Sequence, residues 1–305
     1  MSKVDVLLMG NLPDATARDL AEGFTVHRLP KTGQDEVLDE VGPAIRGMAV
    51  RQTNVPAALL ARLPALEIIA CFSAGLDRID TGAARERGIV VRNGSVAVAD
   101  DVADMAVALL VASLRRLVRG DAFVRDGTWA RRESFPLGRS LGGLRVGIVG
   151  MGHIGVGVAH RLAAMRCEVA YTGPNRKPLD WRYFPDPVAL ADWAEALVVA
   201  CPSTPATRHL IDARVLAALG PQGTLVNVAR GVVVDEAALI DALARDALAG
   251  AGLDVFEHEP EVPEALRRDP RVTLSPHNAG GTEEALRAMG AALVTSLRQH
   301  FAARP

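Results

Sequence analysis

Hydrophobic and polar positions follow two alternating periods along this chain. Short apolar runs of strand length, such as Val4–Met9 and Leu66–Phe72, are separated by stretches with apolar residues at helical spacing, such as Ala15–Glu22. Gly88–Val91 is another short run typical of a strand. Strands that alternate with helices in this way predict a parallel sheet with helices on both faces.

The longest helical pattern, Asp100–Arg116, has two acids near its start, where they suit the helix dipole. We expect this helix to lead out of a first domain. A second alternating series begins at Leu144 and continues to about Pro276, and the tail, Thr282–Phe301, is again helical. The pattern predicts an α/β fold with two Rossmann-like, doubly wound parallel-sheet domains, one inserted into the other.

Composition narrows the class of protein. The 305 residues are 49% hydrophobic and the formal net charge is −2, which gives no basic surface for nucleic acid. Cys71, Cys167 and Cys201 are far apart, so we expect no disulfide framework, no metal cluster and a cytoplasmic location. The apolar run Met105–Leu114 is too short to span a membrane, and the first residues are too short for a signal peptide.

One glycine-rich motif stands between a strand and a helix. The strand Arg145–Val149 leads into Gly150-Met151-Gly152-His153-Ile154-Gly155 and then into the helical Val156–Met165. In this spacing the first glycine permits a tight turn, the second admits a pyrophosphate and the third allows close packing. We interpret the motif as a dinucleotide site. The alternative is a purely structural turn.

The end of the next strand, Glu168–Tyr171, bears on the choice of cofactor. An enzyme that uses NAD places an acid there to bind the ribose 2′-hydroxyl, but Val169–Lys177 contains none. Arg176 and Lys177 instead suit a 2′-phosphate, unless they are ordinary solvated charges on a loop. The sequence therefore favours NADP(H), with NAD(H) as the alternative.

Three later segments carry polar residues at predicted strand ends. They are Leu225–Gly231, Gly252–Pro260 and Leu274–Asn278. Active sites of α/β proteins form at the carboxyl ends of the strands, so we expect these segments to face one site.

Taken together, these stretches resemble the D-2-hydroxyacid dehydrogenase family, in particular its NADPH-dependent glyoxylate, hydroxypyruvate and hydroxyphenylpyruvate reductases. The resemblance is carried by Ser73–Asp80, Asp100–Asp104, Gly150–Gly155, Cys201–Pro205, Asn227–Gly231, Gly252–Pro260 and Pro276-His277. It implies a substrate-binding domain of residues 1–98 and 277–305 and an inserted dinucleotide-binding domain of residues 99–276. It also implies hydride transfer from NAD(P)H to a small 2-keto acid, of the glyoxylate/hydroxypyruvate or aryl-pyruvate type, giving the D-2-hydroxy acid.

The family's catalytic residues correspond to Arg230, Glu259 and His277. The resemblance implies that Arg230 holds the substrate carboxylate through its planar fork of donors. His277 then acts as general acid toward the alkoxide, and Glu259 stabilises the imidazolium. The alternatives are a surface ion pair, a solvated acid and a core histidine. We interpret the neighbouring His258 as a bystander.

The resemblance also implies a wider set of contacts and no metal. The backbone amides of Ala74 and Gly75 would grip the substrate carboxylate, and Asp254 would accept from the nicotinamide carboxamide. Cys201 would contact the cofactor through its backbone, or be a small apolar residue only. Cofactor contacts are implied at Gly150, Gly152, His153, Ile154, Gly155, Asn175, Arg176, Lys177, Cys201, Pro202, Thr207, Val228, Arg230, Asp254 and His277, and substrate contacts at Ala74, Gly75, Arg230 and His277.

Three positions depart from the family pattern. Pro174 stands where the reductases place an arginine, which weakens the preference for NADP(H). Ala279-Gly280 stands where the family has Gly-Ser, which removes a hydroxyl near the nicotinamide, and Ala99 replaces a threonine. None of these changes touches the proposed catalytic residues.

The sequence also leads to predictions about the oligomeric state, an alternative function and substrate selection. We expect a homodimer formed through Asp100–Arg116 and the segment Val124–Leu137, which contains Trp129 and Phe135, unless the helix packs only within its own subunit. A dinucleotide-sensing corepressor or a scaffold on the same fold is the alternative function. The loop Arg51–Val55 and the region near Trp129 are expected to select among 2-keto acids.

Overall fold

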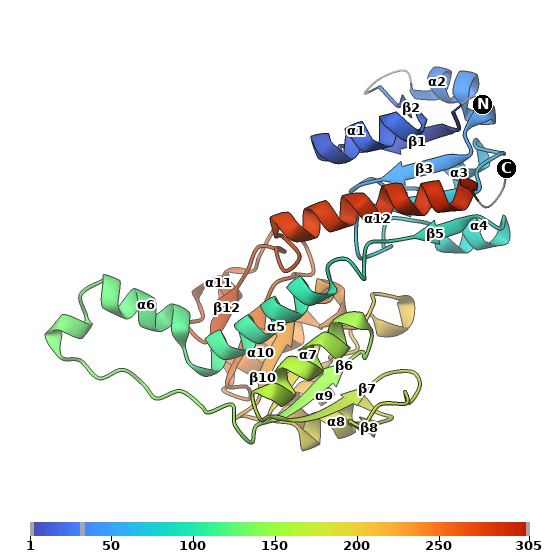
Figure 1. Cartoon of the computed structure of the whole chain (residues 1–305). Coiled ribbons are helices and arrows are strands. Elements are labelled where there is room, and N and C mark those ends of the chain that lie inside the picture. The colour runs from blue at the N-terminus through green and yellow to red at the C-terminus, as the bar shows by residue number, and fades with distance from the viewer. Residues whose placement is uncertain (1–2, 31–33, 303–305) are drawn as a thin grey trace. The chain divides into compact units, whose positions relative to one another are not determined.

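The computed structural model describes residues 3–30 and 34–302 of the chain (Figure 1). The chain divides into two compact units, residues 1–98 with 281–305 and residues 99–280. Each unit is built on one sheet in which every pair of neighbouring strands is parallel. The predicted fold class, two doubly wound α/β domains, is therefore confirmed.

The first unit has five strands in the order β2-β1-β3-β4-β5. All four residues of β3 and of β4 are buried, as expected for parallel strands covered on both faces. The last helix, α12, packs beside α1 and against β4, so both ends of the chain build this unit. The bounds are β1 (Asp5–Met9), β2 (Thr25–Arg28), β3 (Gly47–Val50), β4 (Ile68–Cys71), β5 (Val90–Arg92), α1 (Asp14–Gly23), α2 (Gln34–Val41), α3 (Ala57–Ala61), α4 (Thr81–Glu86) and α12 (Glu283–Ala302).

The second unit has seven strands in the order β12-β11-β10-β9-β6-β7-β8. The direction in which the strands are added reverses between β6 and β9, and this switch point is where α/β sheets bind ligands. The strands are β6 (Arg145–Val149), β7 (Glu168–Thr172), β8 (Arg182–Phe184), β9 (Ala196–Val199), β10 (Thr224–Asn227), β11 (Gly250–Leu253) and β12 (Val272–Leu274). The helices are α5 (Ala99–Leu114), α6 (Leu117–Arg125), α7 (His153–Ala164), α8 (Pro187–Trp193), α9 (Ala213–Leu219), α10 (Glu236–Ala244) and α11 (Glu264–Arg268).

Helix α5 is held against the second sheet by a close backbone approach. Its buried face contacts α7, β10 and β11. At Gly252 in β11 a side chain would lie 3.0 Å from the Cβ of Leu109, so the absence of one lets the helix reach the strand. Within the described part of the chain, no helix combines the length and apolar character needed to cross a bilayer.

An extended segment follows α5, and we call residues 117–141 the arm. It contains α6 and a short 3-10 turn, η2 (Trp129–Arg131), neither of which buries a residue, and it projects from its unit (Figure 1). The side chains of Trp129 and Leu137 are 65% and 92% exposed. The arm is tied at its base, where the Arg139 N–H donates to the Leu114 carbonyl at 2.9 Å.

Candidate active site

The turn after β6 has the geometry of a dinucleotide-binding loop. Gly150 has φ +97°, and a Cβ there would lie 2.6 Å from the Cα of Cys201. A Cβ on Gly155 would lie 2.1 Å from the Gly150 carbonyl oxygen, so neither position has room for a side chain. Gly152 differs, because nothing lies within 4 Å of its missing Cβ and it is exposed at the start of α7. Open backbone at a helix N-terminus fits the pyrophosphate of a dinucleotide.

The loop after β7 presents cations and is fixed at both ends. The buried Tyr171 hydroxyl accepts from the Lys177 N–H at 2.8 Å and donates to the Lys177 carbonyl at 3.3 Å. The Tyr183 hydroxyl donates to the Gly173 carbonyl at 3.0 Å. Between these ties the side chains are exposed: Asn175, Arg176 and Lys177. Residues 173–177, held by these hydrogen bonds, carry two cations and no acid, which suits a 2′-phosphate.

The loop after β9 faces the same switch point. Burial raises the pKa of the Cys201 thiol to about 11, which agrees with a small apolar residue whose backbone lines the loop. Thr207 shapes this loop, because its hydroxyl accepts from the Thr204 N–H and donates to the Pro202 carbonyl, each at 2.8 Å.

The other residues of the predicted cofactor set surround the two loops. His153, the first residue of α7, is exposed, and Ile154 beside it is half-buried. Val228 is buried, and its N–H donates to the Val199 carbonyl at 3.2 Å, which fixes the chain where it leaves β10.

The turn after β10 is shaped by a buried amide that presents Arg230. The Asn227 side chain is 1% exposed. Its Oδ1 accepts from the Ala229 N–H at 3.0 Å, and its Nδ2 donates to the Arg230 carbonyl at 3.1 Å. The Arg230 Nη1 donates to the Ala229 carbonyl at 2.7 Å.

Gly231 packs this turn against the loop that follows β11. A Cβ at Gly231 would lie 1.9 Å from the backbone carbonyl of Phe256, so only glycine fits. The same loop carries Glu259, whose Oε1 accepts from the Phe256 N–H at 3.0 Å. The close contact therefore fixes the arginine and the acid relative to each other.

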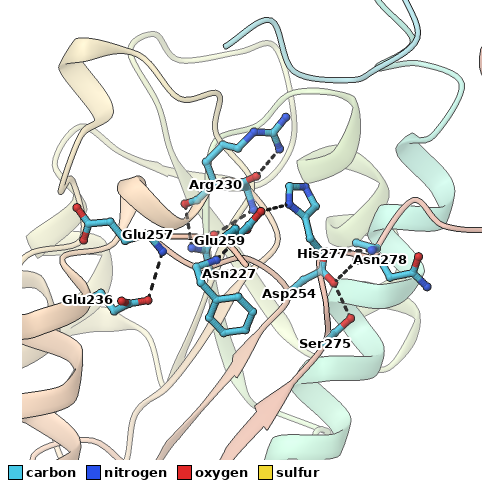
Figure 2. Close-up of polar contacts among 12 residues, drawn as sticks. Asn227, Arg230, Glu236, Asp254, Glu257, Glu259, Ser275, His277 and Asn278 are labelled. Atoms are coloured by element: carbon cyan, nitrogen blue, oxygen red, sulfur yellow. Dashed lines mark hydrogen bonds and ion pairs between the residues drawn. The ribbon is translucent and has the colours of Figure 1, made fainter. Parts of the chain in front are cut away.

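Glu259 and His277 form a direct pair, and Arg230 lies in the same cluster (Figure 2). Oε2 of Glu259 and Nδ1 of His277 are 2.6 Å apart. The His277 side chain is 45% exposed, and its Nε2 has no hydrogen-bond partner within the described residues. One ring nitrogen is thus oriented by the carboxylate, and the other is available for a ligand.

The backbone at His277 is held in an unusual conformation by Asp254. His277 has φ +53°, a left-handed conformation that costs a non-glycine residue on the order of 1–3 kcal/mol. Asp254 is 1% exposed and accepts from the Ser275 hydroxyl at 2.6 Å and from the N–H groups of Asn278 and Ala279 at 2.8 and 3.0 Å. The His277 N–H donates to the Asp254 carbonyl at 2.7 Å. Asp254 therefore braces the whole turn that carries the histidine (Figure 2).

Two further acids, Glu236 and Glu257, stabilise the loop that follows β11. Glu257 pairs with His209 at 2.8 Å and with Arg208 at 3.2 Å, and its N–H donates to Glu236 at 3.3 Å. Burial, assisted by the nearby Glu257 charge, raises the pKa of Glu236. Glu236 and Glu257 lie near the catalytic candidates in the close-up (Figure 2).

The first unit has its own candidate ligand groups at the ends of β3 and β4. The carbonyls of Ala74 and Gly75 accept from Asn93 at 2.6 Å and from the Ser73 hydroxyl at 2.7 Å, while their N–H groups have no partner within the described residues. Arg51 follows β3, and its guanidinium lies 5.2 Å from the centre of the Phe72 ring. The order β2-β1-β3 places Arg51 at the switch point of this sheet.

The structure thus brings Arg230, Glu259 and His277 together. Among the predicted cofactor residues, Gly150–Gly155 and Cys201 lie at the switch point, whereas Arg230, Asp254 and His277 follow the carboxyl ends of β10, β11 and β12. Sequence analysis did not assign the supporting residues Asn227, Gly231 and Ser275, although all three lie in segments that it singled out. It also missed Glu236, for which no signal was present. Among the described residues, no group of His, Cys, Asp and Glu side chains could hold a metal ion.

Comparison with known families gives one match that covers more than half of the chain. Residues 107–279 match the family described as D-isomer specific 2-hydroxyacid dehydrogenase, NAD binding domain.

Similar proteins extend this match to the whole chain. The hydroxyphenylpyruvate reductase of Plectranthus scutellarioides is 40% identical, with 100% of this chain and 98% of that protein aligned. The 2-ketogluconate reductase of Gluconobacter oxydans is 42% identical, with 98% and 96% aligned. Among solved structures, the NADPH-dependent glyoxylate/hydroxypyruvate reductase of Sinorhizobium meliloti, determined with NADP and malonate, is 39% identical with a TM-score of 0.90, and 98% of this chain and 94% of that chain are covered.

Proposed function

The chain belongs to the D-isomer-specific 2-hydroxyacid dehydrogenase family, and from this premise we propose that it reduces a small 2-keto acid to the D-2-hydroxy acid, with NADPH as the preferred cofactor. The observation that carries the proposal is the 2.6 Å pair of Glu259 and His277 in one cluster with Arg230, beside a glycine loop that fits a dinucleotide. Relatives named as reductases of hydroxyphenylpyruvate, of 2-ketogluconate and of glyoxylate and hydroxypyruvate support the reaction class.

The cofactor residues follow from the fit described above. Gly150, Gly152 and Gly155 would hold the pyrophosphate, and Arg176 and Lys177 would hold the 2′-phosphate. The remaining predicted contacts, from Ile154 to Asp254, would bind the cofactor along the carboxyl ends of the strands. The bound nicotinamide supplies the hydride that reaches the keto carbon.

The chain's own residues supply binding and proton transfer. Arg230 has guanidinium donors that match a carboxylate, so we propose that it binds the substrate's carboxylate and polarises the keto oxygen. His277 is held at Nδ1 by Glu259, and its Nε2 donates a proton to the oxygen as negative charge develops there. Glu259 stabilises the imidazolium and fixes the ring. Asp254 positions the turn.

Substrate selection is proposed to involve the first unit. The N–H groups of Ala74 and Gly75 lack partners within the described residues and suit a carboxylate. Arg51 presents a cation at the switch point of that sheet and would favour substrates with polar groups beyond the keto carbon. A site that hydrogen-bonds a polar group of the substrate strongly rejects the analogue that lacks this group, so Arg51 can change the order of substrates.

We further propose a homodimer in the cytosol. The exposed apolar residues of the arm, Trp129 and Leu137 among them, would contact a second copy. The free and buried cysteines, Cys71, Cys167 and Cys201, suit a reducing compartment.

The first experiment is oxidation of NADPH, followed by its absorbance, with hydroxypyruvate, glyoxylate, phenylpyruvate and 2-ketogluconate, each repeated with NADH. We expect turnover of at least one acid and a preference for NADPH. Faster turnover with NADH would retain the reductase and reject the phosphate site. Binding of dinucleotide without turnover of any acid would contradict the proposal and favour a dinucleotide-sensing role.

A further inference from the structure

Glu257 stands two residues before Glu259 but takes no part in the proposed chemistry. Its side chain is 10% exposed and points away from the Glu259–His277 pair (Figure 2). Burial of a carboxylate is unfavourable unless charged or hydrogen-bonding partners compensate for it. The partners of Glu257 therefore indicate what this residue does in its loop.

The partners of the Glu257 carboxylate follow a short 3-10 turn, η3 (Pro205–Thr207), in the loop after β9. Nε2 of His209 lies 2.8 Å from Oε1 of Glu257, and the Arg208 guanidinium lies 3.2 Å from the same oxygen. The pair of Glu257 and His209 thus joins the loop after β11 to the loop that contains the predicted cofactor contact Thr207.

The backbone of His209 is held by the turn that follows Arg230. His209 has φ +49°, a left-handed conformation that is uncommon for a residue other than glycine. Its N–H donates to the Val232 carbonyl at 2.8 Å, and Val232 lies in the 3-10 turn η4 (Gly231–Val233). The ring of His209 therefore starts from a fixed backbone and gives Glu257 a partner in a defined place.

Two further contacts hold the backbone of the loop after β11. The Glu257 N–H donates to Oε2 of Glu236, the first residue of α10, at 3.3 Å. The absence of a side chain at Gly231 lets η4 approach the carbonyl of Phe256. Glu257 is thus held through both its side chain and its backbone, two residues before the proposed catalytic acid.

We propose that Glu257 is a positioning residue, which through its pair with His209 holds the loop where Glu259 can orient His277. The inference rests on the proposed function, because it assigns a role relative to the proposed proton donor. Oε1 of Glu259 accepts from the Phe256 N–H of its own loop at 3.0 Å, so the position of this carboxylate follows the position of the loop. A displacement of about 1 Å at a catalytic group can lower a rate by about 100-fold, so the anchor matters for the rate.

The first test compares two variants of Glu257 in the full-length protein. Glu257→Met has a side chain of similar size with no oxygen to accept from His209, whereas Glu257→Gln retains one. We expect Glu257→Met to lower kcat for keto acid reduction by ~10- to 100-fold and Glu257→Gln to retain most of it. The affinity for NADPH, measured by fluorescence titration, should change less than kcat, because Thr207 keeps its own hydrogen bonds.

A double-mutant cycle with Glu259→Ala separates positioning from general support of the fold. In the Glu259→Ala background, Glu257→Met should lower kcat by less than ~3-fold, because no carboxylate remains to be positioned. An equal loss in both backgrounds would overturn the proposal, since a purely structural effect is independent of Glu259.

A second readout does not depend on turnover. The ring resonance of His277 in proton–carbon NMR, assigned by its absence from His277→Gln, reports the contact with Glu259. Glu257→Met is expected to move this resonance, and Glu257→Gln to leave it near the wild-type position. An unmoved resonance in Glu257→Met would also overturn the proposal. If the wild type reduces no keto acid, the proposed function fails, but this comparison still decides the positioning role.

Asp5→Leu is the matched control, because it breaks a carboxylate–histidine pair of similar length in the first unit, Asp5 with His27 at 2.7 Å. Its kcat and its His277 resonance are expected to match those of the wild type. A loss of kcat as large as that of Glu257→Met would contradict the proposal, because activity would then respond to the loss of any such pair.

Discussion

At the scale of single residues, some polar side chains of the candidate site are placed to take part in the chemistry, and others only shape the loops. Glu259 orients one nitrogen of His277 at 2.6 Å and leaves the other accessible. Thr207 and Cys201, in contrast, use their polar atoms or their burial to build the loops of the cofactor site. The proposed chemistry therefore depends on few side chains, and each can be tested separately.

His277→Gln should lower kcat for keto acid reduction by about 100- to 10,000-fold, because the proton donor is lost. The affinity for NADPH, measured by fluorescence titration, should change far less than kcat, because the other implied cofactor contacts remain. His258→Gln is the matched control, since His258 is the neighbour of Glu259 and has no role in the proposed mechanism. An equal loss of activity in both variants would contradict the assignment.

Arg176→Gln/Lys177→Gln tests the cofactor preference. Loss of charge-assisted contacts with the 2′-phosphate, worth about 1.5–3 kcal/mol each, should raise KM for NADPH by at least ~10-fold. KM for NADH serves as an internal control and should not change. If both values remain at the wild-type level, the two cations are ordinary solvated charges.

At the scale of elements, the turn between β6 and α7 contains one glycine that the fold requires, Gly155, and one that ligand binding would require, Gly152. Gly155 lies inside α7, which begins at His153, three residues before the helix expected from the sequence. The earlier start follows from Gly152, which serves as the N-cap. The exposed second glycine and the packed third glycine should therefore respond differently to the same substitution.

Gly152→Ala should leave the melting temperature close to that of the wild type but weaken NADPH binding, because its Cβ enters open space where the pyrophosphate would lie. Gly155→Ala should destabilise the fold by more than about 1 kcal/mol, since its Cβ meets backbone 2.1 Å away. Thermal denaturation and fluorescence titration of both variants measure the contrast. Strong NADPH binding by Gly152→Ala would contradict the cofactor site.

Glu195 anchors the base of the arm to the sheet in a pH-dependent way. Burial by itself would raise the pKa of Glu195, but the Arg145 N–H and the Arg139 guanidinium outweigh it and lower the pKa. A carboxyl group with a lowered folded-state pKa adds stability above its unfolded value of about 4.3, and this is lost as the pH falls through the folded value. The wild type should therefore melt above Glu195→Gln at about pH 6, with the difference shrinking toward about pH 3. A difference that is constant with pH would exclude the ion pairs as its cause.

The hydrophobic pattern located some elements to within two residues but did not single out others, including the fully buried strands β3 and β9. β6 has the predicted bounds, and the predicted helix Asp100–Arg116 corresponds to α5, Ala99–Leu114. The strand β2 was not singled out either, because two of its four residues are exposed and the other two are only half-buried, so they give no distinct period. The hydrogen bonds of Asp254 could not be predicted from the sequence either, since its partners become neighbours only when β11 pairs with β12.

At the scale of the whole molecule, the arm is the feature that the single chain leaves unexplained. It buries no residue in α6 or η2, although it contains several large apolar side chains. Contact with a second copy would cover them, in agreement with the homodimer expected from the sequence.

Trp129→Ser/Leu137→Ser should shift the chain from dimer toward monomer in sedimentation equilibrium, because the buried apolar contact is lost. The melting temperature of a monomer should change little, since both side chains are exposed within one chain. Val96→Ser, which removes an exposed apolar side chain outside the arm, is the control. A dimer of unchanged strength in the double variant would place the interface elsewhere.

The brace at Asp254 has a consequence for how this site can change during evolution. The aspartate is needed to fold the turn between β12 and α12, so selection for folding alone would retain it. His277 is different, because glycine or asparagine would adopt its left-handed backbone at lower cost. A descendant that kept the aspartate but exchanged the histidine for one of these residues would therefore have relaxed an unfavourable conformation after catalysis ceased to matter.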